Sequence, residues 1–207
     1  MLDIPTKYCE QLLQIGWEPL NTISSLAFVF AGIFALYALR RRNTILRFIL
    51  PFLLILIGIA SSWWHMYHNH YGDIADTLSI IIFSSIITVL FLRKLLESWS
   101  MTLLLFLTIL SVVLTIEQVN FINGSMPYIV LFVTLSIFSV FYIKKFNHSK
   151  MLVVSAIFVF GWAIFFRSID ISICPSIYFG THFLWHVLIA VFGYIMIILV
   201  TSNNLKK

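Results

Sequence analysis

Long apolar stretches, separated by short polar connections, dominate the chain. A helix needs about 20 mostly apolar residues to cross a bilayer, and each stretch is close to that length. Inside a bilayer the backbone must satisfy its own hydrogen bonds, which favours helices. The pattern predicts an all-α integral membrane protein, a seven-transmembrane helix bundle in one domain (1–207) that starts with a short outer segment (1–20). The predicted spans cover residues 21–39, 48–68, 73–92, 101–119, 127–143, 151–167 and 180–201.

The composition agrees with this arrangement and excludes a soluble domain. Hydrophobic residues make up 61% of the chain and charged residues 10%. The mean hydropathy is +1.02, so too little polar surface remains for a water-soluble protein of this size. The alternating strands of a membrane barrel are not evident in the sequence. The opening segment has no basic stretch followed by an apolar core, so we expect no cleaved signal peptide and expect the first span to direct insertion.

Basic residues are distributed unequally between the two predicted faces of the membrane. Lys7 and Arg167 fall on one side. Lysines and arginines concentrate on the cytoplasmic side of membrane proteins, which predicts an outer N-terminus and a cytoplasmic C-terminus. The net charge of +5 therefore orients the chain, and we expect no nucleic-acid partner. The basic residues on the predicted cytoplasmic side are Arg40, Arg41, Arg42, Arg47, Arg93, Lys94, Lys144, Lys145, Lys150, Lys206 and Lys207.

Two histidines, His182 and His186, stand at the start of the last span in the segment THFLWHVLIA. Positions four apart lie on one face of a helix, one turn from each other. Two imidazoles with this spacing can bind the same metal ion. The alternative is a pair of histidines hydrogen-bonded to neighbouring helices. Ionisable groups are costly inside a membrane, and this cost favours the metal site.

A third histidine, His65, lies near the outer end of the second span, with Ser61 one turn before it. Three histidines and one open position are typical of a catalytic zinc site. His68 and His70 compete with His65 for the third ligand position, but they lie further out, where polar residues are common. Taken alone, Ser61 would be a helix-packing hydroxyl. The pattern predicts that His65 joins the pair in the last span.

An acidic residue, Asp76, opens the third span in the segment YGDIADTLSI. Facing lipid would be expensive for a carboxylate, so we expect Asp76 to face the bundle. There it either orients a histidine ligand or handles the proton of a catalytic water. Asp73, one turn earlier, is explained by the favourable position of a carboxylate in the first turn of a helix.

In this order, Ser61, His65, Asp76 and the final-span H-x-x-x-H resemble the signature of the alkaline ceramidase family, part of a wider group of seven-span metal hydrolases that includes the adiponectin-type receptors. The segments WEPLNTISS, SSWWHMYH, RSIDISIC and GTHFLWH also resemble this family, especially its bacterial members. The resemblance covers nearly the whole chain. Each motif is weak alone, but four of them in the right order on seven spans are fairly specific.

The resemblance implies a zinc ion held by His65, His182 and His186, and a catalytic water assisted by Ser61 and Asp76. It implies hydrolysis of the amide bond of a ceramide-like lipid, which releases a sphingoid base and a fatty acid. Asp76 would transfer the proton, and Ser61 would donate a hydrogen bond to the oxyanion.

Animal members of the family also hold calcium near the N-terminus, and Glu10 and Glu18 match two of the acidic positions. Lys7 stands where an aspartate is expected, and the two acids are closer together in sequence than in those members. The alternative is that Glu10 and Glu18 are ordinary solvated acids. Calcium is therefore an open prediction.

The only cysteines, Cys9 and Cys174, both fall on the predicted outer face. A disulfide persists on the oxidising side of a membrane, and the family resemblance suggests a bridge between these two residues. Two unpaired thiols are the alternative.

Other functions fit parts of this pattern. One is a seven-span receptor or transporter with a structural zinc site, although the chain shows no large domain outside the membrane. Another is a hydrolase of a different lipid amide or ester. The expected partners are a membrane lipid and the bilayer itself. The expected location is a bacterial inner membrane, with the site toward its outer face.

Overall fold

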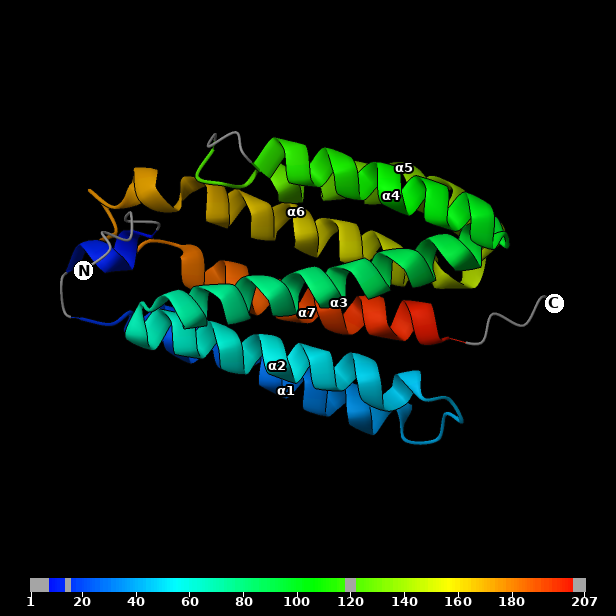
Figure 1. Ribbon diagram of the computed structural model, residues 1–207, viewed down its shortest axis with the longest axis horizontal. Helices are drawn as coiled ribbons and strands as arrows, with labels where there is room; N and C mark the ends of the chain where they lie inside the picture. Colours follow the sequence, from blue (N-terminus) through cyan, green and yellow to red (C-terminus); the bar gives the residue numbers. More distant parts are fainter. Residues whose placement is uncertain (1–7, 14–15, 118–121, 203–207) are drawn as a thin grey trace.

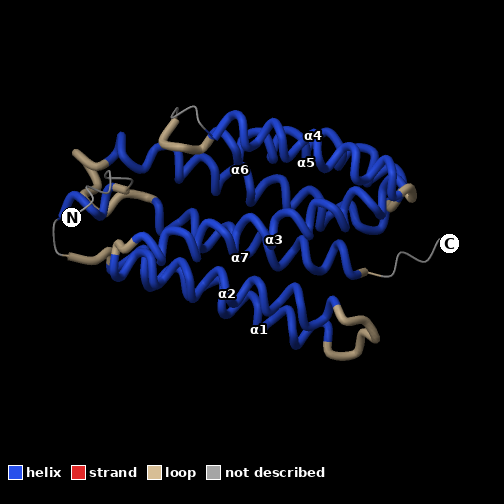
Figure 2. The backbone as a smooth tube through the Cα atoms, in the orientation of Figure 1, coloured by secondary structure: helices blue, strands red, loops and turns tan. Residues whose placement is uncertain are grey.

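The computed structural model describes residues 8–13, 16–117 and 122–202, which form seven long helices and two short 3-10 helices. The helices run up and down in turn, and the described residues contain no strand (Figures 1 and 2). All seven long helices are long and apolar enough to cross a membrane, so the predicted seven-span all-α fold is confirmed. The elements are η1 (Cys9–Leu13), α1 (Pro19–Leu39), α2 (Leu46–Tyr67), α3 (His70–Leu96), α4 (Trp99–Glu117), α5 (Met126–Lys145), η2 (Asn147–Ser149), α6 (Lys150–Ile173) and α7 (His182–Thr201).

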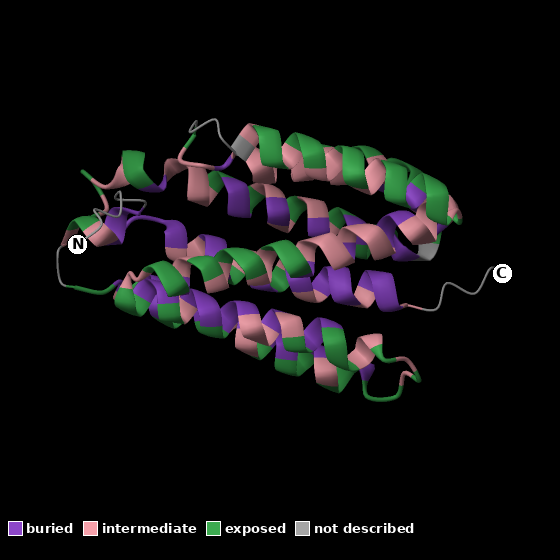
Figure 3. Ribbon diagram, viewed as in Figure 1, coloured by how far each residue is buried: buried purple, intermediate pink, exposed green. Residues whose placement is uncertain are grey.

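The last helix, α7, lies at the centre of the bundle. It packs mainly against α1 and α6 and also contacts α2 and α3. Half of the residues in its apolar span are buried, compared with 11% in α4 and in α5 (Figure 3). Side chains on α7 are therefore shielded by the bundle more often than those on α4 and α5.

The first two helices approach each other closely where small residues meet. A Cβ atom added at Gly58 of α2 would lie 2.9 Å from the backbone oxygen of Ser25 on α1. Small residues let the backbones of membrane helices come together in this way. This close approach brings the serines of α1 next to Ser61 and His65, which follow Gly58 on α2.

The end of the bundle away from η1 is held by an apolar core and two lysines. Phe91 and Tyr142 stack with their ring centroids 4.8 Å apart. Lys94 Nζ donates hydrogen bonds to the backbone oxygens of Leu199 (2.9 Å) and Ser202 (2.5 Å) at the end of α7. Lysines from the predicted cytoplasmic side thus satisfy carbonyls that a helix leaves unpaired at its C-terminus. Lys145 does the same for α3, with bonds to Lys94 O and Leu95 O.

The sixth span differs from its prediction. The helix continues to Ile173 instead of ending near residue 167. Arg167, the last residue of the predicted span, and Asp170, which was expected in the connection after it, therefore both lie within α6, and Asp170 is fully buried there. The physical reason is that both side chains find partners inside the protein, so the polar segment can remain helical.

Candidate metal centre

Three buried histidines converge at the end of the bundle that carries η1. His65 comes from the last turn of α2, and His182 and His186 come from the start of α7. Each offers one ring nitrogen, and these three nitrogens lie within 4.8 Å of one another. Among the described residues, this is the one group of three or more side chains with metal-ligand chemistry that meets in this way. His68 and His70, which competed for the third position, are not part of it.

His65 is oriented by Glu18, which precedes α1. Its Nδ1 lies 2.8 Å from Glu18 Oε2, and the backbone N–H of Glu18 donates to the backbone oxygen of His65 at 2.9 Å. Burial alone would raise the pKa of Glu18, but hydrogen bonds from His65 and His68 outweigh this effect and lower the pKa to about 2. A carboxylate on one ring nitrogen fixes the ring and leaves the other for a metal. That other nitrogen, Nε2, is buried and has no hydrogen-bond partner within the described part of the chain.

His186 is oriented by serines of α1. Ser24 Oγ lies 2.8 Å from His186 Nδ1, and Ser25 Oγ lies 3.4 Å from the same atom. Both hydroxyls also lie within hydrogen-bond distance of the backbone oxygen of Asn21. Because the serines occupy Nδ1, the nitrogen left for a metal is Nε2.

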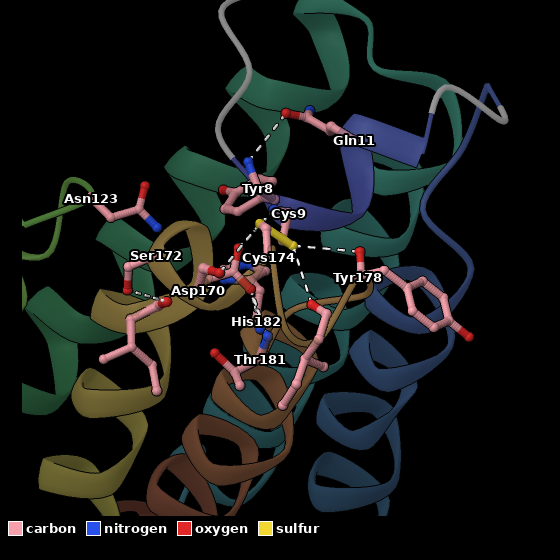
Figure 4. The surroundings of a disulfide bond; sticks show 12 residues. Tyr8, Cys9, Gln11, Asn123, Asp170, Ser172, Cys174, Tyr178, Thr181 and His182 are labelled. Atoms are coloured by element: carbon pink, nitrogen blue, oxygen red, sulfur yellow. Dashed lines mark hydrogen bonds between the residues drawn. A yellow bond between two sulfur atoms is a disulfide. The ribbon is translucent and has the colours of Figure 1, made fainter.

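His182 is positioned through the backbone by Asp170, as Figure 4 shows. Asp170 Oδ1 accepts hydrogen bonds from the backbone N–H groups of Thr181 (2.7 Å) and His182 (2.8 Å). These groups begin α7 and would otherwise be unpaired. Gly180 has a φ of +65°, and a Cβ atom there would collide with Asp170 and Cys9. Only glycine therefore lets the chain pass this close to the carboxylate.

The N-terminal segment closes this end of the site. Cys9 and Cys174 are joined by a disulfide, and the backbone N–H of Cys9 donates to Asp170 Oδ2 at 2.8 Å (Figure 4). The adjacent Tyr8 stacks on the His182 ring with centroids 4.0 Å apart and lies 5.1 Å from that of His65. Burial raises the pKa of Tyr8, so its hydroxyl stays protonated.

The two predicted catalytic residues differ in how far they are buried. Ser61 is buried one turn before His65, and its Oγ lies 3.0 Å from Ser25 Oγ. Asp76 lies in the second turn of α3, is half-buried, and interacts electrostatically with Tyr8 and Arg167. Ser61 is thus linked to His186 through Ser25.

Arg167 is a neighbour of the site that the sequence pattern did not identify. Its guanidinium carbon lies 5.1 Å from the ring centroid of Tyr128, 5.3 Å from Trp185 and 5.9 Å from Tyr8. Cations are attracted to aromatic faces at these distances. The position of a cation within the C-terminal third of α6 was the available signal, since such a residue calls for partners.

The two acids matched to calcium positions are both buried, so their interpretation as solvated acids was wrong. Glu18 is 0% and Glu10 is 2% exposed. Glu10 accepts hydrogen bonds from the backbone N–H groups of Leu20 (2.8 Å) and Asn21 (2.9 Å) at the start of α1. Calcium binding by these two residues stays a prediction.

The donor set fits a metal ion. Three imidazoles are a common ligand set of catalytic zinc, which keeps one further position open. A buried polar atom without a partner is unusual, and His65 Nε2 and His182 Nδ1 have no hydrogen-bond partner among the described residues. Two of the three rings also carry the hydrogen bond on the opposite nitrogen that metal ligands usually have. These three histidines could therefore hold a metal ion.

Comparison with known proteins agrees with the arrangement. The family model described as Ceramidase matches residues 6–207, which is nearly the whole chain. No curated protein matches the chain.

Proposed function

Because this chain belongs to the ceramidase family, we propose that it is a zinc-dependent intramembrane hydrolase of ceramide-like sphingolipids. It cleaves the amide bond and releases a sphingoid base and a fatty acid. The observation that carries this proposal is the convergence of three buried imidazole nitrogens within 4.8 Å. A membrane lipid is the natural substrate, because the site lies within a bundle of helices built to cross a membrane.

His65, His182 and His186 would hold the zinc ion. When bound, zinc supplies Lewis-acid polarisation of the amide carbonyl and activates water at neutral pH. Glu18 and Ser24 keep two of the three rings turned so that their free nitrogens face the third.

The chain's own residues handle the proton and the developing charge. Asp76 takes a proton from the attacking water, whose oxygen bonds to the acyl carbon. Ser61 donates a hydrogen bond to the acyl oxygen as negative charge develops there. When the carbon–nitrogen bond breaks, Asp76 passes the proton to the departing amine. The products are a free amine and a carboxylic acid, which balances the addition of one water.

We place the site toward the outer face of a bacterial inner membrane. The basic connections support this orientation, because they lie at the end of the bundle opposite the histidines. The disulfide between Cys9 and Cys174 lies at the same end as the histidines, and disulfides persist on the oxidising side.

The test uses the full chain purified in detergent. Metal analysis should find about one zinc per chain, and incubation with ceramide should yield sphingoid base and fatty acid by mass spectrometry. Ser61→Ala should keep the metal but lose about 10²-fold in rate, the usual effect of removing one oxyanion donor. His70→Ala is the matched control, because His70 is exposed and outside the site.

Three outcomes would overturn parts of the proposal. Protein that contains no metal and turns over no lipid would remove the enzymatic interpretation. Bound metal without turnover of any lipid amide or ester would favour a receptor or transporter with a structural zinc site. Turnover of a different lipid amide or ester, with ceramide untouched, would keep the chemistry and change the substrate.

A further inference from the structure

His68 ends α2 in a way that turns its side chain back toward the bundle. Its backbone has a φ of +47° and its N–H donates to the backbone oxygen of Trp64 at 2.9 Å. The imidazole Nε2 lies 2.6 Å from Glu18 Oε1. His68 is only 24% exposed, although it follows the last helical residue and precedes a connection.

Glu18 is fully buried between His65 of α2 and His68, which directly follows that helix. Its Oε1 faces His68, and its Oε2 lies 2.8 Å from His65 Nδ1 and accepts from Asn21 Nδ2 at 2.5 Å. Each carboxylate oxygen thus has its own set of donors. The carboxylate of Glu18 therefore links the rings of His65 and His68, which are three residues apart in the sequence.

The contact at Oε1 matters for the orientation of His65. The terminal torsion of a glutamate side chain has a broad energy minimum, so contacts at one oxygen alone leave the carboxylate free to swing. A second contact on the other oxygen fixes the plane of the carboxylate. The direction of the His65 Nδ1 hydrogen bond is then fixed as well, and with it the direction of Nε2.

We propose that His68 is a positioning residue of the metal centre: it holds Glu18 so that His65 presents Nε2 to the two histidines of α7. The inference rests on the proposed function, because it assumes that these three histidines bind a metal. His68 itself is neither a ligand nor a substrate contact. Its role depends on the hydrogen bond to Glu18 and not on its own charge.

The test compares three substitutions at one position in the full chain, loaded with Co²⁺ in place of zinc. His68→Ala removes the hydrogen bond. His68→Gln keeps an N–H group at nearly the reach of Nε2. Alanine and glutamine are both unfavourable at positive φ, so the difference between them isolates the hydrogen bond. His68→Asn suits the left-handed backbone but is too short to reach Glu18, and His70→Ala is the matched control.

Two readouts report on the metal centre itself. Competition with a chelator gives the Co²⁺ affinity, and the visible spectrum of bound Co²⁺ reports the arrangement of its ligands. We expect His68→Ala to bind Co²⁺ about 10-fold more weakly and to shift the spectrum, because Glu18, the partner of the ligand His65, is then no longer held in place. His68→Gln should return to within about 3-fold of the unaltered protein. His68→Asn should bind as weakly as His68→Ala, and His70→Ala should not differ from the unaltered protein.

The inference fails if His68→Ala keeps both the affinity and the spectrum, or if His68→Gln is impaired as much as His68→Ala. Should His68→Ala not fold, the comparison of His68→Gln with His68→Asn decides the question in the same way. Failure of the proposed function is distinguishable, because the unaltered protein would then bind no metal or turn over no lipid.

Discussion

The two ends of α7 are both capped by charged side chains from other helices. At the N-terminus, Asp170 of α6 accepts hydrogen bonds from the backbone N–H groups of Thr181 and His182. At the C-terminus, Lys94 of α3 donates to the backbone oxygens of Leu199 and Ser202. Each charge pairs with backbone groups that the helix leaves unpaired and has the sign that the helix dipole favours.

What differs is the residue that each cap holds. Asp170 holds the first turn of α7, where His182 faces the other two histidines, and also binds the backbone of Cys9 beside the disulfide. Lys94 holds Ser202 and Leu199, and Leu199 is part of the apolar core. The same type of cap therefore positions a candidate metal ligand at one end of the helix and stabilises the fold at the other. The following predictions test this division.

Removing the ligand at the N-terminal end should have the largest effect. His182→Ala leaves two imidazoles, so we expect loss of bound metal and a decrease in turnover of about 10³-fold or more. Metal analysis and lipid turnover measure the two effects together. Retention of both by His182→Ala would exclude His182 from the site, and His70→Ala serves as the control for loss of a histidine.

Removing the N-terminal cap should have the next largest effect. Asp170→Ala leaves two N–H groups at the start of α7 unpaired, and we expect metal affinity to fall by about 10- to 100-fold. Asp170→Asn retains one oxygen acceptor, so its metal affinity should lie between that of Asp170→Ala and that of the unaltered protein. Chelator competition measures the affinity. A variant that loses thermal stability but binds metal normally would show that this cap is only structural.

Crowding the cap should have a smaller effect. Gly180→Ala adds a Cβ atom that collides with Asp170 at a positive φ, and we expect a loss of about 1–3 kcal/mol in the free energy of unfolding. Metal affinity should fall several-fold because the carboxylate must move. Gly161→Ala is the matched control, since its Cβ would meet only Phe132 at an ordinary 3.4 Å. Equal effects of the two substitutions would contradict the close approach at Gly180.

Removing the C-terminal cap should have the smallest effect on function. Lys94→Met keeps the length of the side chain and loses the donors, so we expect the free energy of unfolding to fall by about 0.3–2 kcal/mol. Metal content and turnover should stay within about twofold, as for a site at the far end of a rigid helix. Lys144→Met, at an exposed position of α5, controls for loss of charge. A large loss of metal in Lys94→Met would show that the C-terminal cap of α7 also supports the histidine site, contrary to the proposed difference between the two ends of this helix.

The parts of this molecule that depend on local sequence could be predicted. Seven apolar stretches predicted seven spans, because the thickness of the bilayer sets the length of each helix. The spacing of His182 and His186 predicted a shared face, because it follows from the helical repeat. His65 was the correct third member of the group, since its place near the outer end of the second span puts it at the same depth.

The parts that depend on long-range contacts could not be predicted. Asp170 caps a helix that starts 12 residues later and binds Cys9, 161 residues away. Its polar surroundings also suggested a connection where α6 in fact continues. Glu18 and Glu10 lie outside the predicted spans, where acids are commonly solvated. Only the folded chain shows that both are buried, with Glu18 next to a histidine ring and Glu10 accepting hydrogen bonds from backbone N–H groups. Such contacts between distant residues cannot be predicted from composition or residue spacing.

The chain contributes its three imidazoles very unevenly along its length, and this affects how the protein matures. A nascent polypeptide that has emerged from the ribosome as far as residue 181 contains His65 and Glu18 but neither partner on α7. The group of three histidines is therefore completed only when α7 has been inserted between α1 and α6. Products that stop before α7 lack two of the three histidines, so metal binding at this group would distinguish molecules that contain α7 from those that do not.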